Sequence, residues 1–363
     1  MSRFEENVFG LVRKQDLLQI GYDVTRPNDP VDQVIGDVKT DNLIAYWEDI
    51  ASQYNLPVMA MFHAFDVESQ KTLRVPVDVH NIEKGLIKVK IDQSERLQQL
   101  MKRGVVNEDS LYNRVLDDGY NLSEQVFTRS KVAKNELLAT GKVTIKENNL
   151  DLTVDYGVPS ANTSLTLDFG AGATDTVIDQ LEAIIEMARA NGTPITGLYT
   201  SGAMLSKLRK DASIQQTIGG SVAVGQIVRE SAFREYLRTE YGIGRILVND
   251  LHYSKPLTMG SNGRPVTTDE RFYPVDKVTF LTGDGKIADG LWGDPPVVVA
   301  KNFMNGDGGN TVEGSEVSPY VYVSQYKEND PEIVWTKAEG LFMPALYRPT
   351  ALYIATATAT PGT

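Results

Sequence analysis

Few residues in this sequence have the type and spacing that catalysis or metal binding requires. There is no cysteine, which excludes thiolate zinc sites, iron–sulfur clusters, disulfides and cysteine nucleophiles. None of the three histidines, His63, His80 and His252, pairs with a glutamate at helical spacing, so a histidine zinc site is not indicated. No Gly-x-Ser-x-Gly segment marks a nucleophilic serine. We assign His252, at the end of an expected strand, a structural role.

Residues 167–174, Leu-Asp-Phe-Gly-Ala-Gly-Ala-Thr, are the best candidate for a phosphate-binding loop, because they lie between an expected strand and an expected helix. A dinucleotide fingerprint needs a third glycine where this chain has Asp175, and a triphosphate loop needs a Gly-Lys-Ser/Thr that is absent. We therefore expect a flexible hinge, with Thr174 or Asp175 capping the next helix. Residues 307–316 lack the alternating carboxylates of a calcium loop and are expected to be solvated.

The acidic residues do not single out a catalytic pair either. With 48 aspartates and glutamates, close pairs arise by chance too often for spacing to be informative. The sequence therefore predicts no catalytic, cofactor-binding or metal-binding residue, no cofactor, and no enzyme activity.

Length and composition describe an ordinary globular protein. The 363 residues suggest two or three structural units, and 41% hydrophobic with 23% charged residues is close to the globular average. The net charge of −12 argues against general binding to nucleic acid phosphates. The N-terminus is charged and no apolar stretch approaches the ~20 residues that span a bilayer, so we expect a soluble protein made inside the cell, with no membrane partner.

The strongest element is a long helix over residues 107–140. Asn107 suits its start and Gly141 the position just beyond its end. Gly119 is a weak point, and two shorter helices are the alternative, but the apolar phase continues through it and favours one helix. Charged positions such as Glu124 and Lys131 are expected on its solvent face. Two series of apolar residues spaced by eleven share the opposite face: Leu111, Leu122 and Ala133, and Val115, Val126 and Leu137.

Strands surround that helix. The first ~58 residues are weakly patterned and are expected to form an arm. Short alternating runs from residue 58 to residue 91 predict an extended hairpin, which is marginal alone and needs a partner surface. A second hairpin is expected over 143–154, turning at Asn148-Asn149. A mixed α/β region follows, with helices at 176–191, 201–211 and 225–241 and strands at 195–199, 245–253, 277–281 and 296–300. Further strands are expected from 320 to 357, ending in a frayed Ala-Thr tail.

Three stretches in this order resemble the major capsid proteins of tailed bacteriophages, of the phage lambda type (major capsid protein E family). The first is Asn-Glu-Leu-Leu-Ala-Thr-Gly-Lys-Val-Thr-Ile at 135–145, followed by Val-Asp-Tyr-Gly at 154–157. The second is 245–293, with its Tyr-Pro at 273–274 and later glycines. The third is 332–355, where a strand, Pro344 and a final strand occur in sequence.

The resemblance implies an α+β, Hong Kong 97-like capsid fold with five parts. These are an N-terminal arm (1–58), an extended hairpin loop (59–95), a spine helix with the peripheral-domain hairpin (96–170), an axial α/β domain (171–320) and C-terminal strands that return to the peripheral domain (321–363). The arm and hairpin would lie on neighbouring subunits and find there the burial that they lack internally.

The resemblance also implies a function and partners. The protein would be the major head protein of a tailed phage, assembling as pentamers and hexamers into an icosahedral shell around double-stranded DNA, which it would not bind sequence-specifically. Assembly would take place in the host bacterial cytoplasm with a separately encoded scaffold protein and a portal protein, and a decoration protein would bind the shell. Two alternatives stay open: a cellular nanocompartment shell with the same fold, and an unrelated α/β ligand-binding enzyme built around residues 171–300.

Overall fold

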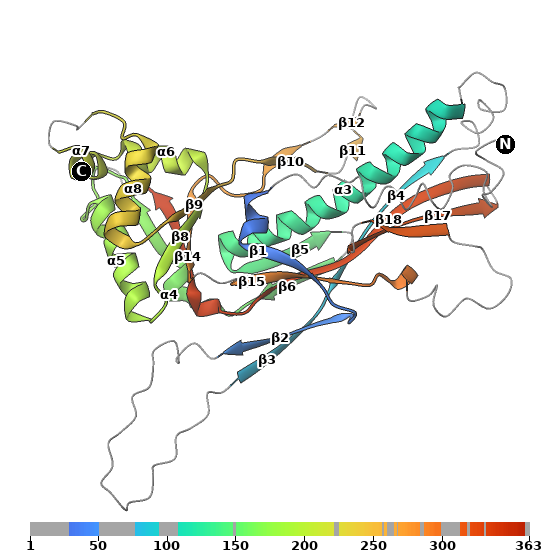
Figure 1. Ribbon diagram of the computed structural model, residues 1–363, viewed down its shortest axis with the longest axis horizontal. Helices are drawn as coiled ribbons and strands as arrows, with labels where there is room; N and C mark the ends of the chain where they lie inside the picture. The colour runs from blue at the N-terminus through green and yellow to red at the C-terminus, as the bar shows by residue number, and fades with distance from the viewer. Residues whose placement is uncertain are drawn as a thin grey trace, which may run out of the picture.

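The computed structural model describes two packed cores and a two-stranded ribbon that projects from them (Figure 1). The expected capping residue Asn107, the first leg of the expected hairpin near residue 60, and His63 lie outside the described residues. The structure describes residues 29–50, 77–93, 108–147, 150–220, 225–255, 258–259, 265–266, 268–283, 287–298, 313–317, 320–329 and 332–359.

The first core lies between a six-stranded sheet and one long helix. Five strands run in the order β1–β15–β18–β17–β16. The sixth strand, β4, lies off this path and pairs with β18. Only β1 and β15 are parallel to each other; the other neighbours are antiparallel. The strands are β1 (Ile35–Lys39), β4 (Gly85–Gln93), β15 (Ala288–Gly293), β16 (Glu313–Val317), β17 (Val321–Asn329) and β18 (Glu332–Leu346).

The helix on this sheet is α3 (Glu108–Thr140), which is continuous through Gly119, so the prediction of a single helix is confirmed. It ends as expected, with Gly141 at φ 72° and its N–H bonded to the Leu137 carbonyl at 2.8 Å. The prediction that Lys131 lies on the solvent face of the helix is wrong, because this residue is only 4% exposed. Of the two apolar series, the members whose burial is described are all buried: Leu122, Val126, Ala133 and Leu137.

Trp292 on β15 is the centre of the first core. Its fully buried indole lies 4.7 Å from the ring of Phe342 and 5.6 Å from that of Phe127 on α3. Gly340 makes room for it, since a Cβ at this position would be 2.9 Å from both the indole and Val126. The helix can therefore approach the sheet closely only because β18 carries a glycine here.

The hairpin after α3 is confirmed as β5 (Lys142–Glu147) paired with β6 (Leu150–Asp155). The opposed residues Val143 and Val154 are buried in the first core.

The second core belongs to a five-stranded sheet with four helices. The strand order is β7–β19–β14–β8–β9, with β7 parallel to β19 and β8 parallel to β9. Its elements are β7 (Leu165–Asp168), α5 (Val177–Ala190), β8 (Ile195–Thr200), α6 (Gly202–Lys210), α7 (Ala212–Gly219), α8 (Glu230–Tyr241), β9 (Arg245–Val248), β14 (Lys277–Thr282) and β19 (Leu352–Thr358).

Short elements complete the described chain. Outside the two main sheets, β10 (His252–Ser254) pairs with β13 (Asp269–Arg271), and β11 (Thr258–Met259) pairs with β12 (Pro265–Val266). The remaining short helices are η1 (Pro30–Gln33), α4 (Ser160–Thr163) and η5 (Pro349–Ala351).

Several expected elements differ from the structure. Residues 245–253 form two strands rather than one, and α7 was not expected. The strand expected at 296–300 is wrong over its described part: residues 296–298 form a helical turn with Val298 N–H bonded to the Pro295 carbonyl. Two consecutive prolines there lack the N–H that a sheet ladder needs. The strand of this region is β15, just before them.

The Ala-Thr tail is ordered as far as Thr358, contrary to the expected fraying. β19 lies between β7 and β14 in the second sheet, so it does not return with β17 and β18 to the first. Conversely, β15 and β16 lie in the first sheet although the sequence placed them in the α/β region.

The arm was expected to extend away from its own subunit, but its described part packs against that subunit. Val31, Val34 and Ile35 are buried in the first core, and residues 44–50 form the first leg of the projecting ribbon. That leg therefore begins earlier in the chain than the sequence predicted.

Candidate functional site

The glycine segment at 167–174 is a connection rather than a ligand loop. The Asp168 carboxylate accepts a hydrogen bond from Gly170 N–H at 2.8 Å, and α5 begins with a capping box. Its cap is Thr176, not Thr174 or Asp175, and Asp179 bonds back to the Thr176 N–H at 3.1 Å. These side chains already occupy donors that a phosphate would need.

The other candidate groups stay apart from one another. His252 is exposed on β10 opposite Arg271, and His80 lies on β3 (Val77–Glu83), one strand of the projecting ribbon. Residues 307–312, which are part of the segment compared above with a calcium-binding loop, lie outside the described residues. Within the described ranges no three potential ligands gather as a metal site would require, and none of the helices there could cross a bilayer.

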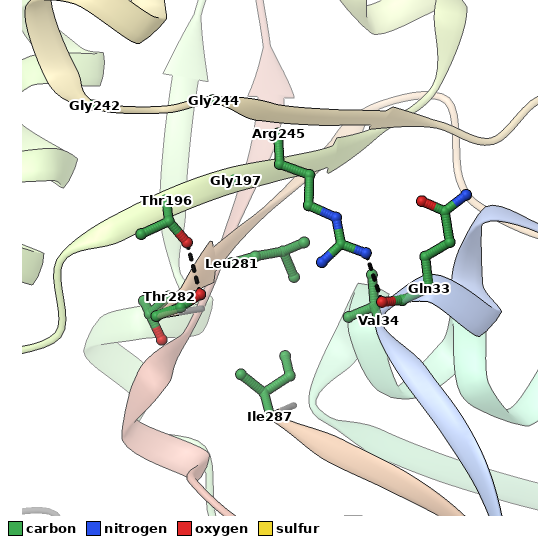
Figure 2. A pocket seen from close by; sticks show the side chains of 11 residues that line it. Gln33, Val34, Thr196, Gly197, Gly242, Gly244, Arg245, Leu281, Thr282 and Ile287 are labelled. Atoms are coloured by element: carbon green, nitrogen blue, oxygen red, sulfur yellow. Dashed lines mark hydrogen bonds between the residues drawn. The ribbon is translucent and has the colours of Figure 1, made fainter. Parts of the chain in front are cut away.

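A cleft of about 330 Å³ lies where the two cores meet (Figure 2). Thr196 and Gly197 of β8, Leu281 and Thr282 of β14, and Gln33 of η1 line it. Its one ionisable lining side chain, Arg245, donates to the Gln33 carbonyl at 2.5 Å. Among the described lining residues no other ionisable side chain lies beside this guanidinium, and this lining favours a joint between two bodies over a reaction site.

A buried polar cluster joins the two cores next to this cleft. Tyr199 on β8 donates to Asn135 Oδ1 of α3 at 2.7 Å and accepts from Asn249 Nδ2 at 2.7 Å. Asn249 Nδ2 also contacts Asp29 Oδ1 at 3.2 Å, and Asp29 accepts from Val31 N–H at 2.9 Å. Asp29, Asn135 and Tyr199 are each 0% exposed. The cluster ties the N-terminal segment, α3 and the second sheet together.

Burial sets the ionisation of this cluster. It raises the pKa of Asp29 above 3.8, and Asp32 raises it further, while Lys131, Lys134 and the Val31 N–H act in the opposite direction. One carboxylate oxygen of Asp29, Oδ2, is buried without a hydrogen-bond partner in the described structure.

The C-terminal end of α3 is fixed to the second sheet. Thr279 Oγ1 donates to the Leu138 carbonyl at 2.6 Å, and Lys277 Nζ donates to the Ala139 carbonyl at 2.7 Å. These carbonyls belong to the last turn of the helix, where intrahelical donors run out. The second sheet therefore caps the helix of the first core.

The N-terminal segment is fixed to α3 by a buried ion pair. Lys134 Nζ lies 2.8 Å from Asp32 Oδ1 and 2.8 Å from Asp37 Oδ1, and its side chain is 1% exposed. Lys131 adds a longer contact with Asp32, 3.7 Å. A charge this deeply buried is tolerated when it is paired.

The ribbon, which consists of β2 (Ile44–Ile50) and β3 (Val77–Glu83), projects away from both cores (Figure 1). Its seven antiparallel pairs run from Ile44–Glu83 to Ile50–Val77. Such a two-stranded ribbon is marginally stable by itself, so it favours contact with another surface.

Exposed apolar side chains also mark the β5–β6 hairpin. Leu150 is 51% exposed and Leu152 is 36% exposed, on the same face as the buried pair nearer the helix. Leu86 at the start of β4 is 38% exposed, and its neighbour Gly85 lies against Ile145 of this hairpin. The ribbon and this hairpin are the described features best suited to contacts between chains.

Comparisons with known proteins agree with a structural role. The family model described as "Phage major capsid protein E" matches residues 87–357. The search of curated proteins gives no match.

Solved structures resemble the chain over most of its length. A phage-related protein from Bordetella bronchiseptica RB50 is 10% identical, with 94% of this chain and 95% of that chain covered and a TM-score of 0.51. The capsid of the Myoviridae phage XM1 is 10% identical, with 92% and 94% covered and a TM-score of 0.48. The satellite phage P4 procapsid is 10% identical, with 97% and 93% covered and a TM-score of 0.45.

Proposed function

The chain belongs to the phage major capsid protein E family, and from this premise we propose how its two cores and its ribbon divide the task of building a shell. The family match over residues 87–357 is the observation that carries the function. The protein is a structural component of the virion capsid and not an enzyme, it assembles with copies of itself into an icosahedral shell, and its α+β fold is the Hong Kong 97-like fold. The nanocompartment and α/β enzyme alternatives are thereby set aside.

We propose that the copies join as pentamers and hexamers, with the second core as the axial domain and the first core as the peripheral domain. The compact α/β body, whose loops lie at one end of the molecule, suits crowding around a symmetry axis (Figure 1). The long helix and sheet of the first core suit the flat wall. Closed symmetry repeats each modest interface many times.

We propose that the ribbon lies on a neighbouring copy. Its base packs on the first core through Ala45 and Ile82, whereas its outer pairs project beyond both cores, which supports a partner outside the chain. The exposed leucines of the β5–β6 hairpin provide a second contact surface.

Assembly is proposed to take place in the host cytoplasm with a separate scaffold protein and a portal protein, followed by binding of a decoration protein. The enclosed double-stranded DNA is held without sequence-specific contacts. The net charge of −12 supports this part, because a wall of the same sign as the phosphates does not retain them.

Electron microscopy of the expressed protein, alone and with a candidate scaffold, tests the proposal. We expect closed shells in the presence of the scaffold. Absence of shells, tubes, pentamers and hexamers under every condition would refute it.

A shortened ribbon separates folding from assembly. Replacing residues 51–76 by Asn-Gly joins β2 to β3 through a two-residue turn and keeps the described pairs. We expect this variant to match the parent subunit in circular dichroism and thermal unfolding, yet to form no shells. Normal shells from this variant would show that residues 51–76 are not needed between copies.

A further inference from the structure

A buried lysine lies at the base of the ribbon. Lys84 is the single residue between β3 and β4, where the return leg of the ribbon enters the first sheet. The outgoing leg passes the same point, in the turn at residues 40–43 between β1 and β2. Lys84 is only 3% exposed, which is unusual for a lysine.

Oxygen atoms from two other segments surround this ammonium. Lys84 Nζ donates to Thr40 Oγ1 at 2.5 Å and to the Asn42 carbonyl at 2.6 Å. The Thr40 and Trp292 carbonyls lie at 3.3 Å each. The oxygens belong to the β1–β2 turn and to the end of β15, so one side chain connects both legs of the ribbon to β15, the strand that carries Trp292.

The ammonium is held by neutral groups. No carboxylate among the described residues lies within ion-pair distance of it, and Asp294 and Asp41 act on it only from farther away. Burial lowers the pKa of Lys84, which shows that its position is costly for the charged form. A buried charge satisfied by carbonyl and hydroxyl oxygens requires those oxygens to stay in place.

The surrounding backbone is shaped for this group. A Cβ at Gly293 would lie 2.9 Å from Lys84 Nζ and 3.1 Å from the Asn42 carbonyl oxygen. The Trp292 carbonyl also accepts from Thr40 N–H at 2.7 Å, so the turn and the β15 end are already joined where the lysine arrives. Glycine at 293 leaves the space that the ammonium occupies.

We propose that Lys84 is a positioning residue for assembly: it fixes the angle at which the ribbon leaves the body and so determines where on the next copy the ribbon lands. This inference rests on the proposed contact between the ribbon and a neighbouring copy. At about 3.3 Å per residue the seven paired residues span about 23 Å, so a swing of about 10° moves their far end by about 4 Å. A displacement of this size is enough to break a packed contact between side chains of the ribbon and of the next copy.

The test measures the ribbon angle directly, in the full chain. Because the chain has no cysteine, spin labels at Asp78→Cys on the ribbon and Gln125→Cys on α3 are the sole thiol labels. The distance between them is measured by pulsed electron spin resonance in unassembled subunits. Lys84→Met removes the ammonium, Thr40→Val removes its closest acceptor, and Lys210→Met, at an exposed position of α6, is the control.

We expect the distance distribution to broaden about twofold in Lys84→Met and less in Thr40→Val, and to stay unchanged in Lys210→Met. Amide hydrogen exchange of residues 40–50 and 77–84 should accelerate roughly tenfold in Lys84→Met, with α5 and α8 unaffected. Electron microscopy should then show misshapen or no particles for Lys84→Met and parental shells for Lys210→Met.

The outcomes separate this inference from the proposed function. An unchanged distance distribution in both Lys84→Met and Thr40→Val refutes the positioning role, as do normal shells from a Lys84→Met subunit whose ribbon has become loose. If Lys84→Met fails to fold, the Thr40→Val distribution decides the matter alone. Failure of the parent protein to form particles refutes the proposed function, whatever the distance measurements give.

Discussion

Replacing Lys134 by methionine should destabilise the first core by about 3 kcal/mol. The side chain is buried, and its ammonium lies 2.8 Å from a carboxylate oxygen of Asp32 and of Asp37. Removing one partner of a buried pair costs about 3–5 kcal/mol, because the other charge stays behind. The lower end applies here, since Asp32 is one-third exposed and keeps its contact with Lys131 at 3.7 Å.

Asp37 should account for most of that loss. Its side chain is 11% exposed and also accepts from Trp292 Nε1 at 2.8 Å. In the double variant Lys134→Met, Asp37→Asn, the amide oxygen can still accept from the indole while the charge is gone. We therefore expect the double variant to recover about 1–2 kcal/mol relative to Lys134→Met.

The assay is urea unfolding of unassembled subunits, followed by the fluorescence of the three tryptophans, of which Trp292 is buried in the first core. Lys146→Met is the matched control, because its ion pair with Asp151 is 3.8 Å long and both side chains are mostly exposed. This control should lie within about 0.5 kcal/mol of the parent. A loss below about 1 kcal/mol in Lys134→Met, or a double variant no more stable than the single one, would refute the reasoning.

Three further expectations concern the cores and their joint. Gly340→Ala should cost about 1–3 kcal/mol because its methyl group meets the Trp292 indole at 2.9 Å, whereas Gly244→Ala, with no atom within 4 Å of its Cβ, should be neutral in the same thermal unfolding experiment. Tyr199→Phe removes a buried hydroxyl with two hydrogen bonds and should lower unfolding stability by about 1–3 kcal/mol, as measured by urea titration. The raised pKa of Asp29 means that the folded state binds its proton more tightly, so the parent should gain stability relative to Asp29→Asn as pH falls from neutrality toward 3.8. A stability difference between these two proteins that does not change with pH would contradict that assignment.

Local patterns in the sequence were sufficient to predict the long helix and the hairpin that follows it. The series of apolar residues spaced by eleven continues through Gly119, and α3 is one helix. Asn148-Asn149 indicated the turn, and β5 and β6 flank it. Both elements take their signal from neighbours in the chain, which is where sequence patterns are informative.

The strand β15 could not be read from its residues. Ala-Asp-Gly-Leu-Trp-Gly does not alternate, since every position is buried between β1 and β18. Gly290 is needed because Lys134 and Asp37 come within 3 Å of the place where its Cβ would be. Those neighbours come from distant parts of the chain, so no local sequence pattern indicates them.

The ion pair between α3 and the N-terminal segment was missed for the same reason. Lys131 and Lys134 share the buried phase of the helix with Ala133 and Leu137, which was a signal that the charges face inward. Their partner Asp32 lies about a hundred residues earlier, and only the fold brings them together. The residue types of the sequence alone predicted no reaction site. The cleft beside Arg245 could be found only in the structure.

The position of β19 has a consequence during protein synthesis. This strand lies between β7 and β14, so the second sheet cannot close until residues 352–358 have left the ribosome. At roughly 5–20 residues per second, β7 waits many seconds after its own synthesis for the strand that pairs with it. A chain that ends before residue 352 therefore lacks the strand that joins β7 to β14, and its second sheet stays open.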